Sequence, residues 1–290
     1  MALVLILSAC ASSVGTSAGS DGGGASEVAG GPQTGGSSVA AGLSGVDPDI
    51  ISALTPATSA DNGRTNILAA RLSLPAQLRT NQCLVSKGWD PLPVTEADEL
   101  PDPQSYNEAN AQFPNIGYLE TNGLPPVNTG EGGPLSETPG EPDPALEQAL
   151  RTCQRSARQR LGEDYTQADD SFDLILGEWY QVIEEVNSSD QVVALRKDFS
   201  SCLVDEGVPP EFAGDEYGFL SHVDALLVAA DFDPEAVRRI LREQGALYMK
   251  CGKEYLTTRA ELRAARRSDF IRKWEPDIRI IADYVDNLPR

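Results

Sequence analysis

Two stretches of the chain share the pattern Cys-Leu-Val-x-x-Gly-x-x-Pro, which begins at Cys83 in the first half and at Cys202 in the second. Each stretch is typical of the last turn of a helix, where the glycine takes a left-handed conformation and the proline prevents the helix from resuming. A second cysteine, Cys153 or Cys251, follows each stretch within a helical pattern. We therefore expect two related helical units, each with two cysteines.

The chain opens with a short apolar segment that ends in Leu7-Ser8-Ala9-Cys10. This segment is too short to cross a bilayer, which needs about 20 apolar residues, but it is typical of the end of a secretory signal peptide. The four residues resemble the bacterial lipobox, which implies a signal peptide over residues 1–9 and a lipid on Cys10. Because no basic residues precede the apolar run, we expect the true signal peptide to start further upstream. An ordinary buried or free cysteine is the alternative.

Glycine, serine and alanine dominate the segment from residue 11 to about residue 46, which contains no aromatic residue. Such a segment cannot form a core, and it behaves as a flexible coil with a reach of roughly 35 Å. We therefore expect residues 10–47 to consist of a lipidated cysteine and a disordered tether, with the folded body beginning at residue 48.

The chain has five cysteines, of which four remain if the lipobox cysteine carries lipid. An oxidising compartment allows such cysteines to pair, and four of them permit three connectivities. A metal site is disfavoured because the close Cys-x-x-Cys spacing is missing and no cysteine lies near the single histidine, His222. The repeated pattern favours pairing within each unit, Cys83 with Cys153 and Cys202 with Cys251. Pairing across the units stays open.

The two units also carry the residues of a known pattern. These are Cys83, Leu84, Gly88 and Trp89 in the first unit and Cys202, Leu203, Gly207 and Cys251 in the second. Together with the lipobox, they resemble a family of uncharacterised actinobacterial exported lipoproteins. Leucine replaces the family's methionine after each cysteine, and no Ala-Asp precedes Cys251. The resemblance covers residues 190–288 well and the first half loosely. It implies a location on the outer face of the cytoplasmic membrane and no particular reaction.

Helical periodicity dominates the body of the chain. Asp143 and Pro144 precede apolar residues at spacings of three and four, which predicts a helix over residues 143–161. The same periodicity predicts helices over 172–186, over 192–203 and, interrupted only by Pro276, over 233–288. We predict a mostly α fold, a helical body stapled by disulfides, with a first unit over 48–189 and a second over 190–290.

The segment between the two cysteines of the first unit is acidic. From Gly88 to Leu150 the chain has twelve Asp and Glu, eleven Pro, and no Lys or Arg. This composition predicts an extended surface loop over residues 90–142. The net charge of the whole chain is -21, which argues against a nucleic-acid partner, because phosphate binding needs a concentrated basic surface.

Candidate chemical groups are few. His222 lies in a helical pattern without a nucleophile motif nearby, so we interpret it as a structural histidine. Glu184 and Glu185 are adjacent on a helix and therefore do not form an acid/base pair. Basic side chains gather along the final helix, where we expect a solvated face; binding of a partner or a polyanion is the alternative. They are Lys250, Lys253, Arg259, Arg263, Arg266, Arg267, Arg272 and Lys273.

A straight helix over residues 233–288 would be longer than the body is wide. It therefore either breaks, at Thr257–Thr258 or at Pro276, and folds back, or it projects from the body. If it projects, its last apolar positions form an exposed strip of the kind that marks a partner surface. The strip consists of Phe270, Trp274, Ile278, Ile281 and Leu288.

These patterns imply no cofactor and no metal, and they favour a non-enzymatic role. The leading hypothesis is a membrane-anchored extracytoplasmic lipoprotein that binds an envelope protein or a cell-wall component. The alternative is a small-molecule binding lipoprotein associated with a transporter, which requires a cleft between domains lined by aromatic residues. An apolar pocket that holds Trp179 or Trp274 beside charged groups would favour it. A hydrolase, the third hypothesis, requires convergent carboxylates in such a cleft.

Overall fold

The computed structural model describes residues 43–100, 102–103, 115–125 and 143–288. Within these residues the chain forms nine α-helices and no strand, which confirms the predicted mostly α fold. The helices are α1 Pro48–Leu54, α2 Ser59–Ser86, α3 Ile116–Asn122, α4 Pro144–Leu161, α5 Glu163–Asn187, α6 Asp190–Asp205, α7 Glu216–Ala229, α8 Pro234–Lys273 and α9 Glu275–Asp286. Two short 3-10 turns are η1 Ala97–Glu99 and η3 Pro210–Phe212. The expected signal peptide, Cys10 and most of the tether lie outside the described residues.

The repeated Cys-Leu-Val pattern ends α2 and α6 in the same way. Gly88 has a φ of +85° and Gly207 a φ of +93°, a conformation that favours glycine. In both turns the amide that follows the glycine donates to the carbonyl of the leucine after the cysteine, at 3.1 Å and 2.9 Å. These are the Schellman bonds that satisfy the carbonyls at a helix end. The predicted helix ends are therefore confirmed.

Helices α1, α2, α5 and α9, together with the end of α8, enclose a first hydrophobic core. At its centre the fully buried Trp179 meets the edge of Phe270 at 5.1 Å between ring centroids. The indole N–H of Trp179 donates to the carbonyl of Pro56 at 3.0 Å, so the ring is fixed in position. Other buried members of this core are Leu54, Leu72, Ile175, Ile183, Ile278 and Ile281.

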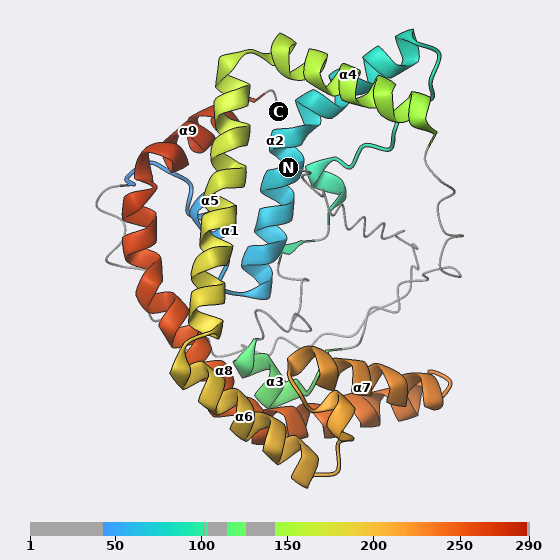
Figure 1. Cartoon of the computed structure of the whole chain (residues 1–290), viewed down its shortest axis with the longest axis vertical. Coiled ribbons are helices and arrows are strands. Elements are labelled where there is room, and N and C mark those ends of the chain that lie inside the picture. The colour runs from blue at the N-terminus through green and yellow to red at the C-terminus, as the bar shows by residue number, and fades with distance from the viewer. Residues whose placement is uncertain (1–42, 101, 104–114, 126–142, 289–290) are drawn as a thin grey trace, which may run out of the picture.

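Helices α3, α6 and α7 and the first part of α8 enclose a second core, to which the end of α5 adds Val186. Aromatic rings fill its centre. Phe219 stacks on Tyr248 at 5.2 Å between centroids, and Phe199 meets Tyr248 edge-on at 5.7 Å. The two cores lie at opposite ends of the molecule's long axis, and α5 and α8 run from one towards the other (Figure 1).

Both disulfides pair cysteines within a unit, as the repeat predicts. Cys83 of α2 bonds to Cys153 of α4, and Cys202 of α6 bonds to Cys251 of α8, with 5.5 Å between the Cα atoms in each case. The first disulfide ties the two helices that flank the acidic segment, and the second ties two helices of the second core. Cross-unit pairing is thereby excluded.

The predicted division at residue 190 is wrong, because the two cores exchange elements across it. α9 and the end of α8 follow residue 190 yet pack in the first core, whereas α3 precedes it and packs in the second. The predicted tether also ends earlier than residue 47, since Leu43 is only 5% exposed in the first core. The acidic segment is not extended throughout, because α3 lies within it.

Of the two outcomes expected for the long helix, a break near Pro276 with folding back is confirmed, and the possible partner surface is wrong. The long helix breaks at Trp274, two residues before Pro276, and α9 folds back onto α5. Ile278 and Ile281 are fully buried, and Phe270 is 7% exposed. Trp274 packs half-buried against the same core, and Leu288 is half-buried. The apolar strip is therefore core rather than an exposed surface.

Candidate functional site: a buried arginine row between the two cores

Three arginines at every fourth position of α8 lie where the helix passes from the second core to the first. Arg259 and Arg263 are each 3% exposed, and Arg267 is half-buried. On one side of them Tyr255 belongs to the second core, and on the other Phe270 belongs to the first. We call Arg259, Arg263 and Arg267 the arginine row. It forms a polar layer between two apolar cores.

Arg259 forms a buried ion pair with Glu216 in the first turn of α7. The hydroxyl of Tyr255 donates to the same carboxylate at 3.0 Å and accepts from Arg259 at 3.1 Å. Arg196 of α6 donates to this hydroxyl at 3.3 Å and to the carbonyl of Asn187 at 3.0 Å. One hydrogen-bonded cluster thus joins the end of α5 to α6, α7 and α8.

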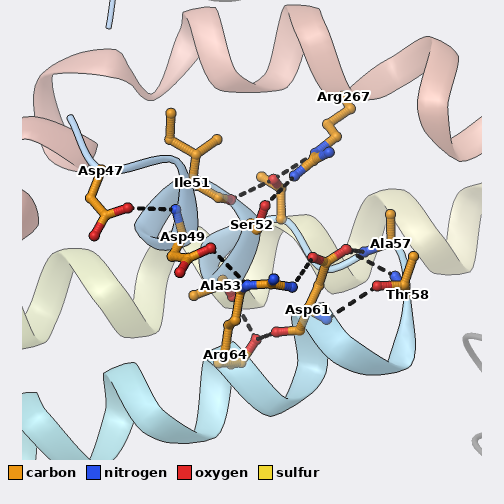
Figure 2. Close-up of polar contacts among 12 residues, drawn as sticks. Asp47, Asp49, Ile51, Ser52, Ala53, Ala57, Thr58, Asp61, Arg64 and Arg267 are labelled. Atoms are coloured by element: carbon orange, nitrogen blue, oxygen red, sulfur yellow. Dashed lines mark hydrogen bonds and ion pairs between the residues drawn. The ribbon is translucent and has the colours of Figure 1, made fainter. Parts of the chain in front are cut away.

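Arg267 reaches the opposite way, towards the first helix of the body. Its Nε donates to Oγ1 of Thr55 at 2.9 Å, and an Nη atom donates to Oγ of Ser52 at 3.4 Å (Figure 2). Thr55 in turn donates to the carbonyl of Ile51 at 2.8 Å. The arginine row therefore ties α8 to α1 at one end and to α7 at the other.

The turn from α1 to α2 is itself fixed by charge (Figure 2). Arg64 pairs with Asp49 at 2.8 Å and with Asp61 at 3.2 Å, linking the two helices. Asp61 also accepts from the backbone amides of Ala57 and Thr58, each at 3.1 Å, and completes a capping box at the start of α2. The point where the N-terminal segment enters the body is thus held by several bonds.

Burial governs the electrostatics of the arginine row. It lowers the pKa of Arg259 to about 9, with further lowering by the charges of Arg263 and Arg196 and an opposing effect of Glu184. Burial likewise lowers the pKa of Arg263 to about 10. It raises the pKa of Tyr255, which the hydrogen bond from Arg196 opposes. At neutral pH these groups therefore keep their protons. The arginines therefore act as donors that hold hydrogen-bond acceptors in place.

The expected solvated face on the final helix is wrong for the arginine row. The periodicity contained a signal for this, since Arg259 and Arg263 continue the inward spacing of Tyr248, Gly252 and Tyr255. The other five members of the predicted basic face are exposed and form ion pairs. These pairs are Lys250–Glu206, Lys253–Glu120, Arg266–Glu185, Arg272–Asp269 and Lys273–Glu178.

The remaining candidate residues lie apart from one another. His222 of α7 packs its ring against Phe212 at 5.5 Å between centroids. Trp179 is fully buried in the first core. Glu184 and Glu185 border a shallow hollow of about 440 Å³ on the surface of α5, next to Tyr180. Among the described residues, neither this hollow nor the one bordered by Arg238 and Arg242 has Trp179 or Trp274 in its lining.

The residues that the structure describes contain no group of three His, Cys, Asp or Glu side chains placed to hold a metal ion. None of their helices combines the length and the apolar character needed to span a bilayer. Comparisons with protein-family models, with curated proteins and with solved structures find no match for this chain.

Proposed function

We propose that the protein is a membrane-anchored extracytoplasmic lipoprotein with a non-enzymatic interaction or assembly role in the cell envelope. In this proposal a lipid on Cys10 holds it at the outer face of the cytoplasmic membrane, as in the actinobacterial family that its sequence resembles. The segment before Leu43 serves as the tether, and the helical body is the part that meets a partner.

The disulfide pattern carries this proposal. The two disulfides use four of the five cysteines: Cys83, Cys153, Cys202 and Cys251. Cys10 is the cysteine that belongs to neither disulfide. Disulfides form and persist in oxidising compartments, outside the reducing cytosol. A single remaining cysteine at the end of an apolar segment, in the sequence Leu-Ser-Ala-Cys, matches the chemistry of a lipidation site.

The anchoring of α1 supports the interaction role. A tethered body presents a defined surface only if the helix next to the tether is fixed to the rest. Arg267 bonds α1 to α8, and Arg64 bonds it to α2. Buried Leu54 and Ile50 add apolar contacts with the first core. The tether therefore continues into a helix that is part of the body.

Metabolic labelling with palmitate in an actinobacterial host, with the protein expressed from its own gene, tests the anchor. The wild-type protein should incorporate the label and partition into detergent. Cys10→Ala should lose the label and release the protein into the medium, whereas Ser13→Ala, outside the lipobox, should behave as wild type. Unchanged labelling and detergent partition of the Cys10→Ala protein would contradict the proposal.

A further inference from the structure

A short piece of the acidic segment lies in the second core, at the opposite end of the long axis from α2 and α4 (Figure 1). We call residues 115–124, which comprise the N-cap Asn115, α3 and the two residues after it, the strap. The strap packs on α8 within the second core. The helices that precede and follow it in the chain, α2 and α4, pack on each other at the other end of the long axis (Figure 1). The strap is thus seated far from both of its neighbouring helices.

The backbone of the strap touches the backbone of α8 directly. Gly123 has a φ of +80°, and a Cβ atom built on it would lie 2.8 Å from the carbonyl oxygen of Leu241. A Cβ atom on Gly245 would lie only 2.4 Å from the Cα atom of Gly123. The amide of Leu124 donates to that same Leu241 oxygen at 3.0 Å. Two glycines far apart in sequence therefore create this seat.

Side chains complete the seat with apolar anchors and opposite charges. Leu119 and Leu124 are 2% and 5% exposed and belong to the second core. Glu120 of α3 pairs with Lys253 of α8 at 2.5 Å. The strap comes from a segment that contains no basic residue, whereas α8 supplies the lysine. The seat therefore selects a helical segment that has one leucine before and one after a glycine, and a glutamate placed to pair with Lys253.

The contacts that hold the strap are made mainly with one element, α8. They include one backbone hydrogen bond, two buried leucines and an ion pair whose side chains stay 64% and 42% exposed. A seven-residue helix such as α3 is not stable by itself, and each ordered residue of the strap loses conformational entropy. The strap should therefore detach before either core unfolds.

We infer that the seat on α8 is a helix-in-groove peptide site, which the strap fills within the same chain. A leucine-anchored helical segment of an envelope protein, with a glutamate for Lys253, fills it instead when it displaces the strap. This inference rests on the interaction role proposed above and supplies the chemistry of the partner. The strap occupies the site in the free protein and lowers the apparent affinity for a competitor.

A labelled peptide of residues 114–127 tests the site in solution. We call the full chain with Leu119→Ala and Leu124→Ala the loosened variant. Fluorescence anisotropy should show that the peptide binds this variant saturably and at least about tenfold more tightly than wild type, because the strap no longer competes. A matched variant with the exposed leucines changed, Leu78→Ala and Leu174→Ala, should bind as weakly as wild type. Adding Gly245→Ala to the loosened variant should abolish binding.

Absence of saturable binding to a loosened variant that keeps its near-UV circular dichroism would overturn the inference. The inference would also be overturned if the loosened variant formed a dimer that the free peptide dissociates. The occupant of the site would then be the strap of a second copy.

If the loosened variant does not fold, amide hydrogen exchange of the wild-type protein tests the inference instead. The Leu124 amide should exchange by local opening, faster than the slowest amides of α8, and exchange only at the rate of global unfolding would contradict a displaceable strap. None of these measurements involves a membrane, so their failure leaves the palmitate experiment unaffected.

Discussion

The most deeply buried ion pair among the described contacts joins Arg259 to Glu216, with side chains 4% and 6% exposed. Removing two charges from water costs free energy, which a buried pair recovers only with good geometry and additional hydrogen bonds. Here Tyr255 bonds to both partners and Arg196 bonds to Tyr255. The ion pair therefore depends on residues of α5, α6, α7 and α8. A substitution at one of these residues leaves the remaining polar groups buried without their hydrogen-bond or charge partner.

Arg259→Met should lower the free energy of unfolding by about 3–5 kcal/mol, because it leaves the Glu216 carboxylate buried without its partner. Urea denaturation measures this change. The control is Arg266→Gln, which removes an exposed ion pair with Glu185 at 3.8 Å and should cost less than about 1 kcal/mol. An equal decrease in the free energy of unfolding for the two variants would show that burial of Arg259 does not affect the stability change. Arg259→Met with Glu216→Leu should regain part of the stability.

His222 is the only histidine in the chain, so its titration can be followed without overlap. Burial lowers its pKa below 6.5, and the Glu211 carboxylate opposes this shift. As the pH falls through about 6.5 the unfolded chain binds a proton before the folded chain does, so stability should decrease towards the folded pKa. An NMR titration of the imidazole should give a midpoint below 6.5. His222→Gln should remove this part of the pH dependence, and a midpoint above 6.5 would contradict it.

At the scale of single helices, the local signals predicted the structure well. The Asp-Pro pair at residue 143 begins α4, and the side chain of Asp143 accepts from Ala145 at 2.8 Å. The glycines after α2 and α6 take the left-handed conformation that their pattern predicts. Such signals act within one turn of helix, so they can be read from neighbouring residues alone.

A pair of glycine substitutions tests this interpretation of helix ends. Gly207→Ala should destabilise the protein by about 1 kcal/mol, because alanine is strained at a φ of +93° although nothing lies within 4 Å of the added Cβ atom. Gly177→Ala should stabilise it by about 0.5–1 kcal/mol, since Gly177 lies inside α5 with equally open surroundings. Thermal unfolding measures both. A stabilising Gly207→Ala would show that the left-handed turn is not maintained.

What covers a helix face could not be predicted from local patterns. The apolar spacing of Phe270, Ile278 and Ile281 fits a core and a partner surface equally well, and the break at Trp274 decides between them. The arginine row was predictable as inward-facing, but its acceptors were not. Glu216 lies 43 positions from Arg259, and Ser52 lies 215 positions from Arg267. Only the assembled fold brings these residues together.

At the scale of the whole molecule, the two cores are joined by shared helices rather than by a linker. α8 supplies buried residues to both cores, and α5 ends with Val186 in the second. The arginine row fills the space between them with bonds to α1 and α7. Destabilisation of one core therefore also destabilises the other, because the two share continuous helices. We expect the body to unfold as one unit.

Removal of either disulfide tests this cooperativity. The pairs Cys83–Cys153 and Cys202–Cys251 span 70 and 49 positions, and closing loops of this size stabilises by about 4 kcal/mol each on loop entropy. Replacing either pair with serine should lower the melting temperature by roughly 10 °C. It should do so in a single transition, because the shared helices couple the cores. Cys10→Ser, outside the described body, should leave the transition unchanged. Two separate transitions in calorimetry would instead mean that each disulfide stabilises its own independent half.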